Sequence, residues 1–149
     1  MDPAEAYAVA AVADGSPGRA LVAGSRAFRS ARDAALSVLR TASGRTSPAE
    51  RLQAAVVLTS GKAPAGEREE LATRVRMLAS LVRDVALVAQ GGGDEDLANR
   101  DLAGELAGFA AAFDNQRAVR AYACADQALA ALRRNASPKV VAAWLAVQL

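Results

Sequence analysis

Apolar residues recur along the chain at the three- and four-residue spacing of α-helices, and no segment alternates between apolar and polar residues as a half-buried strand does. The longest helical pattern covers residues 67–90. Its apolar positions form two seams: Leu71, Val75, Leu78, Val82, Val85 and Ala89 in the first, and Met77, Leu81 and Val88 in the second. Because apolar residues cover much of its circumference, this segment is predicted to be the central helix of a bundle.

Turn and cap residues divide the rest of the chain into further helices. Gly15 ends the first helix and Ser16-Pro17 starts the second, Ser47 and Glu50 have the spacing of a capping box, and Asp114 caps a later helix. These helices are predicted at residues 3–13, 17–41, 48–60, 100–113, 116–134 and 138–149. The pattern therefore predicts an all-α fold, a bundle of about six to seven helices.

Each amphipathic helix is predicted to bury one face. The face of the second helix consists of Leu21, Phe28, Ala31, Ala35, Leu36 and Leu39, while Arg26, Arg29, Arg32, Asp33 and Arg40 lie largely outside it and are expected in solvent. In residues 116–134, the positions available for burial are Val119, Tyr122, Ala123, Leu129 and Leu132. The last helix carries an apolar stripe of Val141, Leu145 and Leu149 beside Trp144.

The composition favours the same fold class. The chain has 149 residues, enough for one ordinary domain, and its 52% of apolar residues with only 4% of aromatics favours closely packed helices. Its formal charge of +2 comes from dispersed arginines, without a basic block interleaved with aromatics, so a nucleic-acid groove is not indicated. No signal peptide or long apolar run is present, and we expect a cytoplasmic protein without a membrane span.

The residues needed for most enzyme chemistries are missing. The chain has no histidine to act as a base and a single cysteine, Cys124. Ser60-Gly61-Lys62 resembles the end of a P-loop, but Val56 stands where the first glycine of that motif belongs. The acidic run of Glu67, Glu69 and Glu70 is typical of an exposed helix start. We expect no catalytic activity, no cofactor and no metal.

Three short stretches resemble a known family: DGSPGRAL at residues 14–21, LANRD at residues 97–101, and LRRNASPKVVAAWLAVQL at residues 132–149. They are similar to the C-terminal region of bacterial DNA polymerase III clamp-loader subunits, most of all the delta-prime type. In that family a turn of the form L-x-x-N-x-N/S-P-R/K precedes a leucine-rich terminal helix. Here the turn is formed by Leu132, Asn135, Ser137, Pro138 and Lys139.

The resemblance implies a division of labour along the chain. Residues 1–42 would be the end of an AAA+ lid with its connecting helix, and residues 43–149 a helical collar domain for oligomerisation, both belonging to a longer subunit with an ATPase-like domain. The partners would be gamma/tau-type and delta-type subunits in a hetero-pentamer that places the sliding clamp on DNA. DNA would be contacted only through the complex.

The lid turn also bears on nucleotide sensing. In related ATP-binding subunits the turn reads GSxRxAL and its arginine senses the phosphate, whereas this chain has Gly15, Ser16, Pro17 and Gly18, with Arg19 one position later. One residue turns a helix by about 100°. The resemblance therefore implies a non-hydrolysing subunit. Among apolar residues of the last two helices, Tyr122, Trp144 and Leu145 are candidate interface anchors, with burial in the domain's own core as the alternative.

Two other functions remain open from the sequence. One is a free-standing helical ligand-binding or regulatory domain, such as the sensor half of a transcription regulator. A DNA-reading domain encoded upstream would favour it, and an upstream ATPase-like domain would favour the collar. The other is an ATP-binding module, which calorimetry with ATP would detect.

Overall fold

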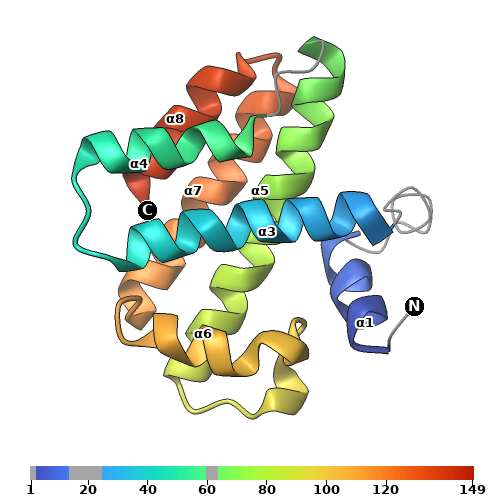
Figure 1. The fold of residues 1–149 in the computed structure, drawn as a ribbon, viewed down its shortest axis with the longest axis vertical. Coiled ribbons are helices and arrows are strands. Elements are labelled where there is room, and N and C mark those ends of the chain that lie inside the picture. Colours follow the sequence, from blue (N-terminus) through green and yellow to red (C-terminus); the bar gives the residue numbers. More distant parts are fainter. Residues whose placement is uncertain (1–2, 14–24, 60–63) are drawn as a thin grey trace.

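The computed structural model describes residues 3–13, 25–59 and 64–149 (Figure 1). Within these residues it contains seven α-helices, three short 3-10 helices and no strand, which confirms the predicted all-α bundle. The elements are α1 (Pro3–Val12), α3 (Ser25–Ser43), α4 (Pro48–Ala55), η1 (Val56–Leu58), α5 (Pro64–Ala89), η2 (Asp94–Asp96), η3 (Arg100–Leu102), α6 (Ala103–Ala110), α7 (Asn115–Arg133) and α8 (Pro138–Gln148).

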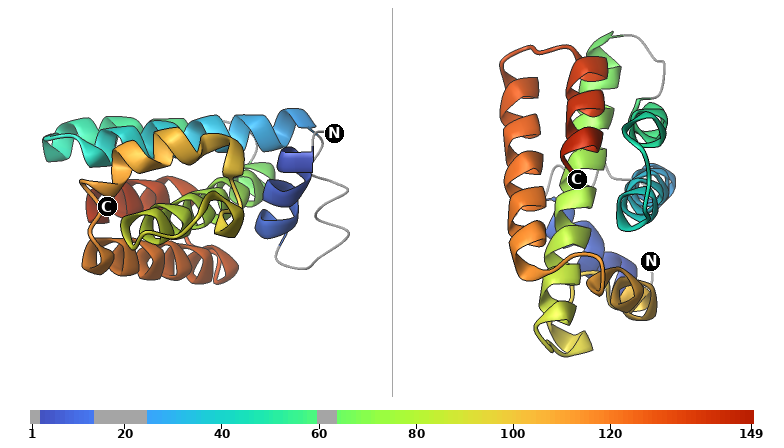
Figure 2. Two further views of the ribbon diagram at one scale, coloured as in Figure 1. Left: turned by 90° about the horizontal axis from the view of Figure 1, so that it is seen from below. Right: turned by 90° about the vertical axis from the view of Figure 1, so that its left-hand side faces the viewer.

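Helix α5 is the central helix, as its two apolar seams predicted. It contacts α3, α6, α7 and α8, and α1 also packs against it. Helices α5 and α8 lie between α7 on one side and α3 with α4 on the other (Figure 2). All seven seam residues between positions 71 and 85 are buried, whereas Ala89 is exposed. The last turn of α5 therefore extends beyond the core.

One hydrophobic cluster holds these helices together. It contains Ala8 of α1, Phe28 and Leu39 of α3, and residues of every later α-helix, with Phe28 and Phe113 among its largest fully buried side chains. The predicted apolar faces of α3 and α8 are buried where the structure describes them. Since the cluster contains residues from before and after position 42, the expected functional boundary at 42/43 coincides with no break in the core and stays a prediction.

The buried face of α7 differs from the predicted one. Val119 is 61% exposed, Tyr122 is 42% exposed and Ala123 is also exposed, so their predicted burial is wrong, while Leu132 is buried as predicted. The face that packs inward consists of Ala118, Ala121, Ala125, Ala128 and Leu132. Alanine lets two helix axes approach closely, and here it lines the side of α7 that faces the bundle. The larger apolar residues are left outside.

The local signals for helix ends are confirmed at Ser47–Glu50 and at Asp114, whereas Gly15 and Ser16-Pro17 lie outside the described residues. The Ser47 hydroxyl accepts a hydrogen bond from the Glu50 amide at 3.3 Å, and the Ser47 amide donates to the Glu50 carboxylate at 2.7 Å, which completes the capping box. Gly91 ends α5 with a φ of 80°, a left-handed conformation that suits glycine. The helix predicted at residues 100–113 is shorter: η3 and α6 together cover 100–110.

No helix among the described residues combines the length and the apolar character needed to cross a bilayer.

Candidate subunit interface

The five lid-motif residues, Gly15, Ser16, Pro17, Gly18 and Arg19, lie outside the described residues. The other two motifs and the three candidate anchors lie within them.

The LANRD stretch ties the segment after α5 back onto the bundle. The carboxylate of Asp84 on α5 is fully buried and accepts hydrogen bonds from the amides of Ala98 and Asn99, at 3.2 and 2.8 Å, and from the Asn99 side chain at 2.9 Å. The Asn99 side chain also donates to the hydroxyl of Ser80 at 3.1 Å. The asparagine of the motif thus has a local structural role, which is to hold the loop on α5.

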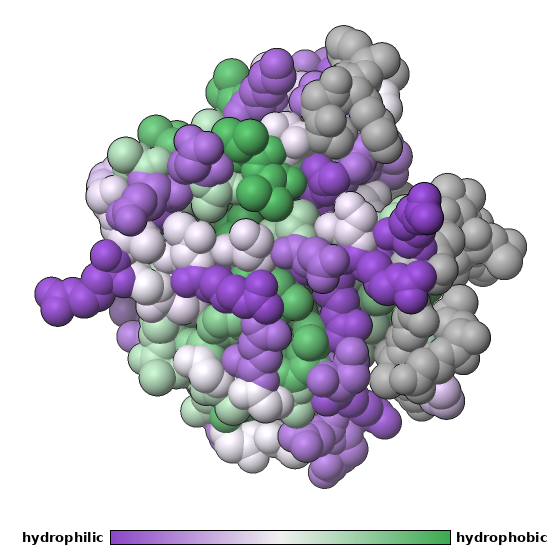
Figure 3. All heavy atoms as spheres, viewed as in Figure 1, coloured by the Kyte–Doolittle hydropathy of each residue, from purple (hydrophilic) through white to green (hydrophobic). Residues whose placement is uncertain are grey.

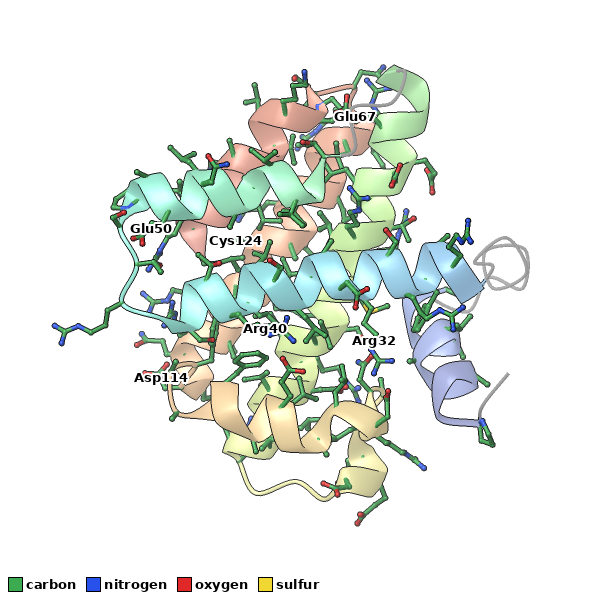
Figure 4. The ribbon with its side chains drawn as sticks, in the orientation of Figure 1. Arg32, Arg40, Glu50, Glu67, Asp114 and Cys124 are labelled. Atoms are coloured by element: carbon green, nitrogen blue, oxygen red, sulfur yellow. The ribbon has the colours of Figure 1, made fainter. Side chains whose placement is uncertain are left out.

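The acidic residue of LANRD joins this segment to α3. Asp101 forms an ion pair with Arg32 at 2.5 Å, and Arg40 pairs with Glu105 of α6 at 2.6 Å; both arginines reach from α3 toward the η3–α6 segment (Figure 4). Arg32 was expected in solvent, but its side chain is only 12% exposed. Glu67, expected at an exposed helix start, is 7% exposed. Both expectations are wrong; Arg32 is engaged by Asp101, which lies 69 positions away in sequence.

The turn between α7 and α8 has the geometry that its sequence requires. Asn135 is the one described residue other than glycine with a positive φ, 63°, and the amide of Ala136 donates to the carbonyl of Ala131 at 3.0 Å. This is a Schellman C-cap, in which asparagine tolerates the left-handed conformation. Pro138 is buried in the first turn of α8, Ser137 precedes it at the N-cap without a side-chain cap bond, and Lys139 is exposed.

Arg117, which the sequence did not single out, fixes the start of α7 against three helix ends. Its guanidinium donates to the main-chain oxygens of Ala42, Ala112 and Leu149 at 2.7, 2.8 and 2.8 Å, and it lies 4.3 Å from the centre of the Phe113 ring. Burial lowers the pKa of Arg117 from its ordinary value, the charge of nearby Arg51 lowers it further and Asp114 opposes the change. The guanidinium stays charged at neutral pH.

Of the three candidate anchors, two are exposed and one is not. Trp144 is 37% exposed and Tyr122 is 42% exposed, whereas Leu145 is fully buried among the core residues of its own domain. Leu145 lies one residue further round α8 than Trp144, on the face that meets α4 and α5, so it is not available to a partner. The expectation that Leu145 anchors an interface is therefore wrong.

Exposed apolar side chains gather on two neighbouring helices. Helix α4 packs on α8, and each turns large apolar residues outward (Figure 3). We call this set the α4–α8 strip; it consists of Leu52 (46% exposed), Val56 (59%), Val140 (66%), Trp144 (37%) and Val147 (39%). Leu52 of α4 and Val56, the first residue of η1, are four positions apart, and the strip residues of α8 are three or four positions apart, so each set shares one face. The α8 part of the strip starts at Val140, two residues after Pro138 of the turn.

Because the chain has no histidine, cysteine and carboxylate side chains are the candidate metal ligands of the described residues. Among them, no three cysteine or carboxylate side chains gather as a metal site requires. Cys124 is half-buried on α7, and burial raises the pKa of its thiol, which keeps it protonated at neutral pH.

A scan against protein-family models, a search of curated proteins and a search of solved structures found no match to this chain.

Proposed function

We propose that this chain is the non-catalytic, collar-forming part of a DNA polymerase III clamp-loader subunit of the delta-prime type. Its role is to hold the subunit in the loader pentamer through contacts between helical domains. The observation that carries the proposal is the α4–α8 strip, five large apolar side chains exposed on two adjacent helices next to the family-like turn.

The strip has the composition of a protein interface. Clusters of exposed apolar residues mark sites of protein association more often than isolated ones do, and tryptophan is enriched among the residues that dominate binding energy. Trp144 is flanked on its face of α8 by Val140 and Val147, each more than a third exposed. A stable interface buries about 800 Å² on each partner, which two short helices can supply.

The motif residues support the same proposal through the positions they occupy. Asn99 and Asp101 hold the segment after α5 on α5 and α3, and the Asn135–Pro138 turn sets where α8 begins and so how the strip is presented. The contacts of these motif residues within the domain explain why they occur where they do in the sequence. These contacts are compatible with a role in assembly and require no ligand.

The proposal is tested by measuring binding of the chain to the C-terminal regions of gamma/tau-type and delta-type subunits. Trp144→Glu with Val140→Glu puts two charges into the strip at positions that are already exposed, so the fold should persist while binding weakens roughly a hundredfold. Gln116→Glu with Gln127→Glu, at two exposed positions on α7, introduces the same two charges; it is the matched control and should bind like the unchanged chain. Equal binding by both variants, with helical content preserved, would remove the strip from the interface.

The second candidate function, a ligand-sensing regulatory domain, is favoured by open cavities on the surface. Small-molecule sites are mostly lined by apolar and aromatic side chains, however, and two cavities of about 620 and 610 Å³ on this surface are lined mainly by charged and polar ones. The coding sequence upstream of residue 1 separates the two functions. A degenerate P-loop domain there supports the collar, and a DNA-reading domain supports the sensor.

A further inference from the structure

A groove of about 620 Å³ runs between α5 and α7, on helices other than those of the α4–α8 strip. It follows α5 from Arg68 to Arg83 and α7 from Tyr122 to Arg133. Alanine and leucine side chains, Ala72, Ala79, Leu129 and Leu132, supply its apolar lining. Ala72, Ala79 and Leu132 are nearly covered by their neighbours, so the apolar lining is narrow and continuous with the core.

Arginines outnumber acids along the groove. Arg68, Arg76, Arg83 and Arg133 line it together with two acidic residues, Glu69 and Asp126, so that four positive charges face two negative ones. Such an excess within a concave surface attracts a negatively charged partner and raises the rate of its binding.

Two of these four arginines form ion pairs with acidic residues of the described chain. Arg76 lies 3.6 Å from Glu69, and Arg83 lies 3.2 Å from the buried Asp84. Within the part of the chain that the structure describes, Arg68 and Arg133 make no ion pair, and the Nε of Arg68 is buried without a hydrogen-bond acceptor. Since no carboxylate of the described residues pairs with these two guanidinium groups, a partner's carboxylates can do so.

The spacing of the arginines along α5 suits a helical partner. Arg68, Arg76 and Arg83 are eight and seven residues apart, which places them about 12 and 10.5 Å apart along the helix axis. A partner helix that lies in the groove can pair with these arginines through carboxylates two of its own turns apart. Its small apolar residues can contact the apolar side chains that line the groove. Glu69 and Asp126 would repel the continuous phosphate chain of a nucleic acid.

From these observations we propose that the α5–α7 groove is a docking site for an acidic amphipathic helix of a partner protein. The site shares no residue with the α4–α8 strip, so the two surfaces can be occupied at the same time.

Selection from a display library of helical peptides tests this proposal. The full chain is the bait, and each selected peptide is then titrated against Arg68→Glu/Arg133→Glu and against Arg45→Glu/Arg120→Glu, a pair of exposed arginines outside the groove with the same change in charge. We expect enriched peptides with more Asp and Glu than Lys and Arg, bound at least about tenfold more weakly by the groove variant and unchanged by the control. Binding should also weaken as salt is raised to about 0.5 M.

Several results would overturn the site. The proposal fails if no peptide is enriched above a selection without bait, or if the enriched peptides have no excess of Asp and Glu. It also fails if the groove variant and the control variant bind the peptides equally. Oligothymidylate that binds and competes with the peptides would assign the groove to single-stranded nucleic acid instead. If the Arg→Glu pair lowers the melting temperature, Arg68→Gln/Arg133→Gln takes its place, and undiminished peptide binding by that variant counts against the proposal.

Discussion

At the scale of single residues, the side chains with most hydrogen bonds serve the architecture. The last carbonyls of a helix lack partners within the helix, and the negative end of its dipole favours a nearby cation. Arg117 donates hydrogen bonds to main-chain oxygens at the ends of α3, α6 and α8, and it also brings a positive charge to these ends. The Asp84 carboxylate instead accepts hydrogen bonds from the main-chain amides of Ala98 and Asn99. Both residues connect segments that are distant in sequence.

Replacement of Arg117 should destabilise the fold more than that of any neighbouring arginine. In Arg117→Ala three main-chain oxygens lose their donor, and we expect a loss of about 2–4 kcal/mol in the free energy of unfolding, measured with urea. Arg117→Lys should recover part of it, because lysine keeps the charge without the fork of donors. Arg120→Ala, exposed on the same helix, should change stability by less than about 0.5 kcal/mol. Equal losses at 117 and 120 would contradict the role of Arg117.

Glu50 gives the capping box a dependence on pH. Hydrogen bonds from the amide and hydroxyl of Ser47 lower the pKa of Glu50 from its ordinary value of 4.5. Folding therefore favours the carboxylate: its contribution is complete above that ordinary value and is lost as the pH falls through the lowered pKa. Unfolding experiments from pH 6 to pH 3 should show a stability advantage over Glu50→Gln that disappears toward acid. An advantage independent of pH would show that the charge is irrelevant.

At the scale of elements, the contact between α5 and α7 is made by a seam of small residues. Ala118, Ala121, Ala125 and Ala128 lie at three- and four-residue intervals, and each is at most 2% exposed. This seam brings the helices close and leaves Tyr122 outside, where it lines the groove. The shape of the α5–α7 groove thus follows from the small size of the residues beneath it.

Enlarging one residue of the seam should push the two helices apart. Ala125 is 1% exposed, so Ala125→Leu has no room for its side chain and is expected to cost about 1–3 kcal/mol in thermal or urea unfolding. Ala123→Leu is the matched control, since Ala123 is exposed on the same helix and leucine is also a good helix former. The idea of a tight seam fails if the two variants unfold at the same urea concentration.

Local patterns predicted the elements well and their environments less well. The capping box and the Asp114 cap are determined by residues a few positions apart, so the sequence was enough to find them. The buried face of α7 was misassigned because hydrophobicity alone ranks Val119 above alanine, while close packing selects for size. Arg32 and Arg117 were missed as linking residues because their partners are 69 and as many as 75 positions away.

At the scale of the whole molecule, two surfaces of different character lie on one helical bundle with a shared hydrophobic cluster. The α4–α8 strip is apolar and suits a stable interface, and the α5–α7 groove is basic and suits a more salt-sensitive contact. Of the candidate site, the sequence offered Trp144 and Tyr122 as anchors; both side chains are exposed, and their role in an interface stays a prediction. The sequence missed the contribution of α4, since nothing local shows that Leu52 and Val56 end up beside α8.

The central claim is that this domain assembles with other clamp-loader subunits. Light scattering of the chain, mixed with the C-terminal regions of gamma/tau-type and delta-type subunits and separated by size-exclusion chromatography, measures this directly. We predict that the 15.3 kDa chain elutes in a complex with the summed mass of its partners, and that Trp144→Glu with Val140→Glu returns it to the monomer position. A chain that stays at 15.3 kDa in every mixture would contradict the claim.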